Sequence, residues 1–203
     1  MKGKFITFEG SEGCGKSTQS KLLKEFLEQK GFSVLFVREP GGTKISEKIR
    51  EILLDAKNDF MTSQCEMLLY MAARAQIAQE VIKPALEEGK IVLCDRFLDS
   101  TKAYQGYGLG IDLDLIKKLG KYVCQNIVPD LTILLDVPLK EGLAHRESAK
   151  DRIEQRPLSY HERVRNGYFS LARSQPKRIK IVKVEKDKFA TQEAVRRLAL
   201  AII

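Results

Sequence analysis

Short apolar segments recur along the chain and are separated by stretches with helical periodicity. Residues 4–8, 33–37, 91–95, 131–137 and 180–184 are mainly apolar, and each segment has the length of a strand. The segments 91–95 and 131–137 are apolar at almost every position, which is typical of parallel strands buried on both faces. The pattern therefore predicts five strands, two of them fully buried.

The stretches between these segments place apolar residues on one side of a helix. Helical spacing is found in three sets, which are Leu22, Leu23, Phe26 and Leu27, then Ile45, Ile49, Ile52 and Leu53, and finally Val195, Leu198, Ala199 and Ile202. Further helices are expected over 63–87, where Pro84 should kink the end, and over 112–126. Gly31 is placed to end the first helix.

Strands and helices alternate without an internal repeat, a low-complexity tract or a flexible linker. This alternation predicts an α/β fold, with a five-stranded parallel sheet flanked by helices on both faces. The segment 141–156 is rich in charged residues and is expected to be an exposed, mobile excursion. We therefore predict a single domain over residues 1–203.

Composition narrows the class of protein. The 203 residues carry a formal net charge of +8, which suits either a nucleic acid or phosphorylated small molecules as partners. The aromatic–basic motif of an RNA-binding sheet is absent, so we expect no nucleic-acid partner. The apolar stretches are far shorter than the roughly 18–20 residues of a membrane span, and no targeting segment is visible. A cytoplasmic protein without a membrane partner is expected.

The four cysteines are widely spaced and form no CxxC pair, and neither histidine lies near a cysteine. A structural zinc site is therefore not expected, and free thiols fit the pattern. Cys65, Cys94 and Cys124 are expected to be small core-filling residues.

Residues 10–17 read GSEGCGKS and match the phosphate-binding pattern GxxxxGK[ST], between a predicted strand and a predicted helix. The glycines let backbone N–H groups turn inward around phosphate oxygens, and the start of the helix adds its positive dipole end. Lys16 is predicted to reach the β- and γ-phosphates, and the Ser17 hydroxyl to bind Mg²⁺. The predicted ATP-binding residues of this loop are Gly10, Ser11, Glu12, Gly13, Cys14, Gly15, Lys16, Ser17 and Thr18.

The loop alone does not specify a reaction. A GTPase would need an NKxD-type signature, which the chain lacks, and a motor ATPase would pair the loop with a strand that ends in Asp-Glu. The strand 91–95 is instead followed by an arginine, in the pair Asp95-Arg96. An arginine beside the active-site aspartate indicates a second anion, and hence a phosphotransferase with two phosphorylated ligands.

Three further segments accompany the phosphate loop. They read REPGGT at 38–43, LLYMAARAQ at 68–76 and DRFLDSTKAYQGYG at 95–108. Together with VIKPAL, PDLTILLDV and DRIE, they resemble thymidylate kinase (dTMP kinase) in order and spacing over essentially the whole chain. The resemblance is to the bacterial type, with a non-basic phosphate loop and a basic lid.

The resemblance implies the P-loop nucleoside monophosphate kinase fold, a homodimer, and Mg²⁺ with ATP as co-substrate. It implies phosphorylation of dTMP to dTDP for dTTP synthesis, by direct in-line transfer of the γ-phosphoryl group. The residues that it places at the dTMP site are Glu12, Glu39, Pro40, Tyr70, Arg74, Asp95, Arg96, Ser100, Thr101, Tyr104 and Gln105.

Individual roles also follow from the resemblance. Tyr70 stacks on the thymine, Arg74 donates to a base carbonyl, and Tyr104 packs against the deoxyribose. Ser100, Thr101 and Gln105 make polar contacts to base and sugar. Glu12 is aimed at the acceptor nucleotide, where we expect it to accept a hydrogen bond from the 3′-hydroxyl.

Catalysis is assigned to cations, because the dTMP phosphate is itself the nucleophile and needs no general base. Lys16, Arg96 and Arg152 are the predicted catalytic residues, with Arg152 in a mobile lid over about 141–156. Arg146 is expected to stack on adenine. Ser17 and Asp95 are the predicted metal-site residues, and Arg50 is a further phosphate-ligand candidate.

Simpler alternatives stay open at this point. Tyr70 could be a core aromatic, Arg74 a surface arginine, and Ser100 and Thr101 helix caps. Asp95 and Arg96 could form a purely structural ion pair. At the level of function, the alternatives are another small P-loop nucleoside or nucleotide kinase and a nucleic-acid-associated NTPase.

Overall fold

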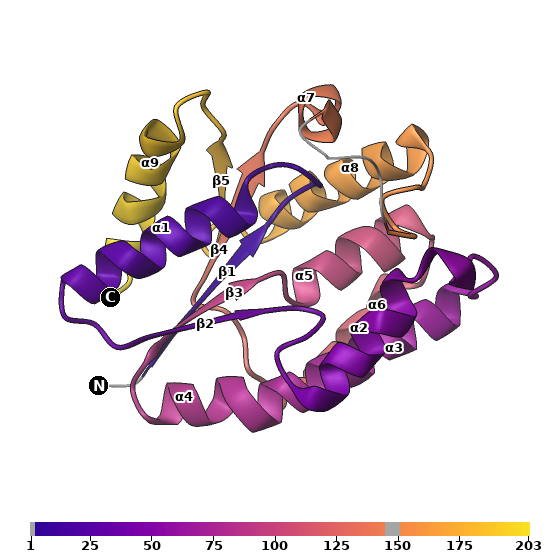
Figure 1. Ribbon diagram of the computed structural model, residues 1–203, viewed down its shortest axis with the longest axis horizontal. Helices are drawn as coiled ribbons and strands as arrows, with labels where there is room; N and C mark the ends of the chain where they lie inside the picture. The colour runs from indigo at the N-terminus through magenta and orange to yellow at the C-terminus, as the bar shows by residue number, and fades with distance from the viewer. Residues whose placement is uncertain (1–2, 145–150) are drawn as a thin grey trace.

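Five parallel strands form one sheet in a computed structural model that describes residues 3–144 and 151–203 (Figure 1). The strands are β1 Lys4–Glu9, β2 Val34–Arg38, β3 Ile91–Asp95, β4 Leu131–Asp136 and β5 Ile179–Lys183. Their order in the sheet is β2-β3-β1-β4-β5, and every pairing is parallel. The predicted fold class is confirmed, and each strand lies within a residue or two of its predicted position. The prediction of a single domain stays a prediction.

Helices cover both faces of this sheet, as predicted (Figure 1). On one face lie α1 Lys16–Gln29 and α9 Lys188–Leu200, which contact each other. The helices on the other side are α2 Lys44–Leu54, α3 Ser63–Ile77, α4 Lys83–Glu87, α5 Leu98–Thr101, α6 Leu113–Val123 and α8 Leu158–Ser174. The short α7, Leu139–Ala144, follows β4, and a 3₁₀ turn at Ala56–Asn58 joins α2 to α3.

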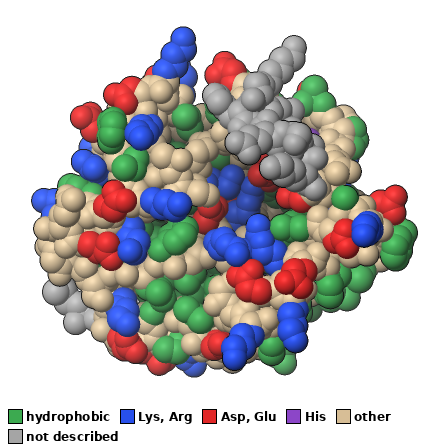
Figure 2. Space-filling model, viewed as in Figure 1, with side chains coloured by type: hydrophobic (Ala, Val, Ile, Leu, Met, Phe, Trp, Pro, Cys, Tyr) green, Lys and Arg blue, Asp and Glu red, His purple; other side chains and the backbone are tan. Residues whose placement is uncertain are grey.

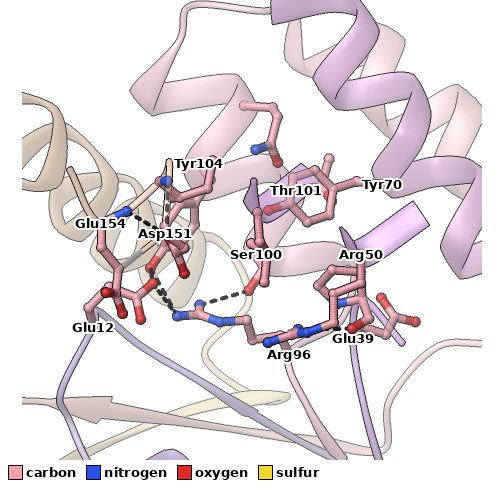
Figure 3. A pocket seen from close by; sticks show the side chains of 14 residues that line it. Glu12, Glu39, Arg50, Tyr70, Arg96, Ser100, Thr101, Tyr104, Asp151 and Glu154 are labelled. Atoms are coloured by element: carbon pink, nitrogen blue, oxygen red, sulfur yellow. Dashed lines mark hydrogen bonds and ion pairs between the residues drawn. The ribbon is translucent and has the colours of Figure 1, made fainter. Parts of the chain in front are cut away.

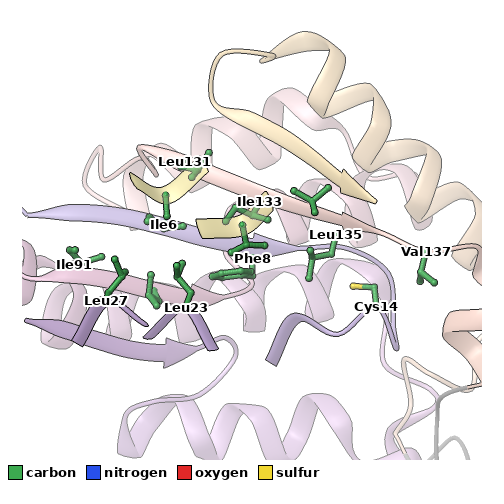
Figure 4. Packing of buried hydrophobic residues seen from close by; sticks show 14 residues of the cluster. Ile6, Phe8, Cys14, Leu23, Leu27, Ile91, Leu131, Ile133, Leu135 and Val137 are labelled. Atoms are coloured by element: carbon green, nitrogen blue, oxygen red, sulfur yellow. The ribbon is translucent and has the colours of Figure 1, made fainter. Parts of the chain in front are cut away.

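The core is built by the alternation of side chains along the strands. Ile6 and Phe8 of β1 pack with Leu23 and Leu27 of α1 on one face (Figure 4). Phe5 of the same strand points to the opposite face and joins a cluster with residues of the helices there. Each face of the sheet therefore has its own apolar cluster, and β3 and β4 are buried on both sides as expected, whereas the edge strands β2 and β5 are only partly buried.

The first helix ends at the predicted glycine. Gly31 has a φ of 85°, which a residue without a side chain adopts easily. The Phe32 N–H donates to the Leu27 carbonyl and the Gly31 N–H to the Glu28 carbonyl, which is the Schellman arrangement. The prediction for Gly31 is confirmed.

The predicted helix over 63–87 changes form before its proline. A π-helical turn over Ala78–Ile82 separates α3 from α4, and Pro84 occupies the first turn of α4. Proline offers no N–H to the carbonyl four residues earlier and its ring crowds that carbonyl, and the wider π turn accommodates both effects. The irregularity therefore lies N-terminal to Pro84. A second π turn, Lys102–Gly108, follows α5.

The helix α8 is not among the predicted elements. Its residues Tyr160, Val164, Tyr168 and Leu171 are all buried, and their spacing of four, four and three residues is helical. That spacing is the signal by which α8 could have been found.

Two smaller expectations can also be compared with the structure. All four cysteines have free thiols, and Cys94 and Cys124 are buried, whereas Cys65 is exposed on α3, so its predicted place in the core was wrong. None of the helices in the described ranges is long and apolar enough to cross a membrane. The cytoplasmic location stays a prediction.

Candidate active site

The predicted ligand-binding segments meet at the carboxyl ends of the parallel strands, where α/β proteins bind ligands. The phosphate loop follows β1, the Glu39-Pro40 pair follows β2, and Arg96 follows β3. Figure 2 shows that this view of the surface is hollowed near its centre, with basic side chains inside the hollow. Three segments that lie far apart in the sequence therefore meet at one edge of the sheet.

The phosphate loop has the backbone that its glycines allow. Gly10, Gly13 and Gly15 all have positive φ values, of 142°, 70° and 83°. A side chain at Gly13 would also collide with the Gly142 carbonyl. Gly15 precedes the first residue of α1 and has no side chain that could cap the helix, so the N–H groups of the first turn stay available to an anion.

Lys16 lies against this loop. Its ammonium donates to the Ser11 carbonyl at 2.9 Å and to the Gly10 carbonyl at 3.3 Å, so the positive charge lies inside the curve of the loop. Cys14, by contrast, packs in the hydrophobic core, and burial raises the pKa of its thiol. Cys14 can therefore face a ligand only with its backbone.

Around the loop lies a pocket of about 380 Å³. It is lined by Glu12, Gly13, Gly15, Lys16, Ser17, Thr18, Arg38, Glu39, Arg50, Asp95 and Arg96. Within it the Ser17 hydroxyl donates to Asp95 Oδ2 at 2.7 Å. Two adjacent oxygen donors suit Mg²⁺, which commonly takes one or two protein ligands beside substrate phosphates. The residues present therefore fit the predicted metal.

A second cavity, of about 180 Å³, adjoins the first (Figure 3). It is lined by Glu12, Glu39, Pro40, Arg50, Leu54, Tyr70, Arg96, Ser100, Thr101, Tyr104, Gln105, Asp151, Ile153 and Glu154. All but Leu54, Asp151, Ile153 and Glu154 are residues that we singled out from the sequence. Four residues line both pockets, namely Glu12, Glu39, Arg50 and Arg96. The two pockets therefore share a wall of charged side chains.

Arg96 is the centre of that wall (Figure 3). Its backbone has a φ of 72°, an uncommon conformation for a residue other than glycine, and such residues cluster at functional sites. One guanidinium nitrogen donates to Glu12 at 2.6 Å and to the Tyr104 hydroxyl at 3.1 Å. The other donates to Ser100 Oγ and to the Gly10 carbonyl, both at 3.2 Å. The guanidinium is thus held at the junction of the two pockets.

Glu12 is the acidic residue inside the phosphate loop. Burial alone would raise the pKa of its carboxyl, but the charges of Arg96 and Lys16 outweigh that effect and lower the pKa to about 2. The Tyr104 hydroxyl also donates to Glu12, at 2.7 Å. At neutral pH Glu12 is therefore an ionised acceptor that points away from the loop, toward Arg96 and Tyr104.

Arg74 does not line the second cavity but contacts two residues that do. Its side chain is 1% exposed, so the alternative of a surface arginine is wrong. The guanidinium donates to Glu39 at 2.7 Å, to Thr101 Oγ1 at 2.9 Å and to the Phe97 carbonyl at 3.1 Å. Burial raises the pKa of Glu39 to about 7, although Arg74 opposes this. Arg74 therefore supports the residues that line the cavity.

The other simple alternatives are also contradicted. Ser100 and Thr101 lie inside α5 and do not cap it, because the residue before the helix is Phe97. Arg96 pairs with Glu12 and Asp95 accepts from Ser17, so the two neighbours are not each other's partners. Tyr70 is half-buried and lines the second cavity, so it is not a core aromatic.

Arg152 lines neither of the two pockets, contrary to its predicted catalytic role in the lid. Its guanidinium pairs with Glu66 at 2.6 Å and donates to the Leu53 carbonyl at 3.1 Å, and its side chain is 7% exposed. The physical reason is the buried Glu66, whose charge requires a cation. Arg146 lies outside the described residues, as does the middle of the predicted lid, so these two predictions stay predictions.

Comparisons with known proteins agree with the family resemblance seen in the sequence. The thymidylate kinase family model matches residues 8–195. The thymidylate kinase of Thermoanaerobacter pseudethanolicus is 47% identical over 195 residues, which cover 92% of this chain and 96% of that relative. That of Geotalea daltonii is 52% identical over 189 residues, covering 89% and 88%. A crystal structure of thymidylate kinase from Ehrlichia chaffeensis aligns with a TM-score of 0.81 and 36% identity, covering 98% of this chain and 99% of that one.

Proposed function

The chain belongs to the thymidylate kinase family, and from this premise we propose how its two pockets carry out the reaction. It phosphorylates dTMP with ATP, as the motifs predicted. The observation that supports the mechanism is the shared wall of the two pockets, Glu12, Glu39, Arg50 and Arg96. We assign the phosphate-loop pocket to the ATP phosphates and the second cavity to dTMP, so that the two phosphates meet at Arg96.

The chemistry then needs alignment and positive charge more than a base. The dTMP phosphate is mostly doubly ionised near pH 7, because its second pKa is about 6. One of its oxygens attacks the γ-phosphorus directly while the bond from that phosphorus to the β,γ-bridging oxygen breaks, so that ADP leaves with the bridging oxygen. Lys16 neutralises the β- and γ-phosphates, and Arg96 neutralises the acceptor phosphate. Ser17 and Asp95 would hold Mg²⁺, which would supply positive charge to offset that of the phosphates.

The dTMP cavity orients the nucleotide through its aromatic and polar lining. Tyr70 and Tyr104 offer ring faces to the base and sugar, and Thr101 and Gln105 offer polar groups. Arg74 donates to Thr101 and Glu39, at 2.9 Å and 2.7 Å, and so holds both side chains in position. In place of its predicted contact with the base, we assign Arg74 the role of holding this lining in position.

A substrate comparison tests the proposed function. With ATP and Mg²⁺, ADP release is expected to be fastest with dTMP, slower with dUMP and dGMP, and absent with thymidine. Preference for the nucleoside would contradict the assignment, since Arg96 would then have no acceptor phosphate to bind. ATP hydrolysis stimulated by DNA and indifferent to monophosphates would favour the NTPase alternative.

Glu12 is proposed to bind the 3′-hydroxyl of dTMP, because it is ionised and borders both pockets. In the same assay, the 3′-deoxy analogue of dTMP is expected to have a KM about tenfold higher, since a hydrogen bond to a charged group contributes about 1.5–3 kcal/mol. The KM for ATP should not change. Equal KM values for dTMP and its analogue would contradict the assignment.

We also propose that the protein is a homodimer, as the family resemblance implies. Exposed apolar side chains on the neighbouring helices α2 and α3 support this, since Ile45, Ile52 and Leu68 are each about half exposed, at 53%, 47% and 53%. Sedimentation equilibrium at micromolar concentration tests the proposal, and a monomer would contradict it.

A further inference from the structure

A buried carboxylate lies directly behind Arg96. Glu9, the last residue of β1, is fully buried, and no lysine or arginine in the described part of the chain forms an ion pair with it. Its oxygens accept from the Phe97 N–H at 2.8 Å, from Ser100 Oγ at 2.6 Å and from the Tyr168 hydroxyl at 2.8 Å. Burial raises the pKa of Glu9. The carboxylate is thus satisfied by neutral donors.

The Tyr168 hydroxyl stands between this carboxylate and Arg96. It donates to Glu9 Oε2, and it accepts from Arg96 Nη1 at 3.3 Å. Ser100 Oγ has the same two neighbours, at 2.6 Å from Glu9 and 3.2 Å from Arg96. Two hydroxyls therefore separate a buried acid from the cation at the junction of the pockets.

The separation has a chemical consequence. A direct ion pair between Arg96 and the buried Glu9 would be strong, because the surroundings have a low dielectric constant. Such a pair would draw the guanidinium into the protein and away from the two pockets. The hydroxyls satisfy the carboxylate and leave one guanidinium nitrogen directed toward Glu12 and Tyr104.

Tyr168 is fixed well enough to act as a spacer. Its side chain is buried, and its ring packs edge-on against Tyr104 with 6.2 Å between the ring centres. The preceding Gly167 lies so close to the Tyr107 ring that a Cβ there would approach to 2.7 Å. The position of α8, and hence of the hydroxyl, is set by close packing.

We propose that Tyr168 is a positioning residue for phosphoryl transfer, which holds Arg96 at the acceptor phosphate by standing between it and Glu9. The proposal rests on the role assigned to Arg96 in the proposed function. It adds a residue of α8, an element with no residue in the lining of either pocket.

The test is Tyr168→Phe, which keeps the ring and removes the hydroxyl. We expect the affinity for dTMP and kcat each to fall about tenfold, because one hydrogen bond to the charged guanidinium is lost and Arg96 moves toward Glu9. The affinity for thymidine as a competitive inhibitor and the KM for ATP should stay within twofold of the wild type. Thymidine lacks the phosphate that Arg96 binds, so a phosphate-selective loss separates positioning from packing.

A matched control is Tyr160→Phe in the same helix. Tyr160 is equally buried and also packs against Tyr104, but its hydroxyl contacts Arg156 and the Tyr104 carbonyl. The Tyr160→Phe variant should have a lower melting temperature than the wild type, without the selective loss of dTMP affinity. Equal losses for dTMP and thymidine in Tyr168→Phe, or no loss, would overturn the proposal.

A double variant tests the role of the buried Glu9 charge directly. In the double variant Glu9→Gln with Tyr168→Phe, the buried charge that attracts Arg96 is gone, so part of the lost dTMP affinity should return. If the losses of dTMP affinity in the single variants Glu9→Gln and Tyr168→Phe simply add in the double variant, the spacer role is overturned. Failure of the wild-type protein to use dTMP would instead contradict the proposed function, so the two failures are distinguishable.

Discussion

Replacing Lys16 with methionine is expected to lower kcat for dTMP phosphorylation about a thousandfold in a protein that still folds. The Lys16 ammonium lies inside the phosphate loop, 2.9 Å from the Ser11 carbonyl, in a pocket that also contains Ser17 and Asp95. Charge on the transferred phosphoryl group shifts during the reaction, and methionine has nearly the same length without a charge to offset it. Steady-state kinetics with saturating dTMP and ATP measure the effect.

The control for this variant is Lys21→Met, one turn further along α1. Lys21 is exposed on the same helix, so its substitution removes the same charge without touching the loop. Its kcat should stay within a factor of two of the wild type. If the kcat of Lys16→Met fell by less than tenfold, Lys16 would not be the cation that stabilises the transferred group.

The parts of the site that were predictable from the sequence are local. The phosphate loop was recognisable because its glycines, lysine and serine are contiguous and follow a short apolar strand. The strands at 91–95 and 131–137 were recognisable because burial on both faces requires apolar residues throughout. In each case the physical requirement acts on neighbouring residues, so a single segment contains the whole signal.

The parts that were not predictable join distant segments. Glu9 and Tyr168 are hydrogen-bonded across 159 positions of the chain, and Arg156 meets Glu66 across 90. Nothing in the sequence around Glu9 shows that its carboxylate is buried and met by hydroxyls. The role given to Arg152 illustrates the same limit, because an arginine in a charged segment can meet any carboxylate that the fold brings near it.

Replacing Glu66 with glutamine is expected to destabilise the protein by about 3–5 kcal/mol, the usual cost of leaving buried charges without their partner. The Glu66 side chain is fully buried, and each of its two oxygens faces N–H groups of neighbouring side chains. Arg152 and Arg156 reach Oε2 at 2.6 Å, and Gln105 reaches Oε1 at 2.9 Å. An amide placed there would direct its own N–H groups at a donor in either orientation, and two guanidinium groups would lose their anion.

The measurement is the midpoint of thermal unfolding at a fixed protein concentration, where a fall of roughly 10 °C is expected for a chain of this length. The control is Glu28→Gln, which breaks the exposed pair with Lys24, where the side chains are 43% and 38% exposed. Pairs of this kind contribute only about 0.3–0.5 kcal/mol on a helix, so the midpoint should change by about 1–2 °C. Equal shifts in the two variants would mean that the carboxylate of Glu66 does not anchor the segment 151–156 to α3. This segment carries Asp151, Ile153 and Glu154, which line the dTMP cavity. The KM for dTMP should therefore also be higher in the Glu66→Gln variant than in the Glu28→Gln variant.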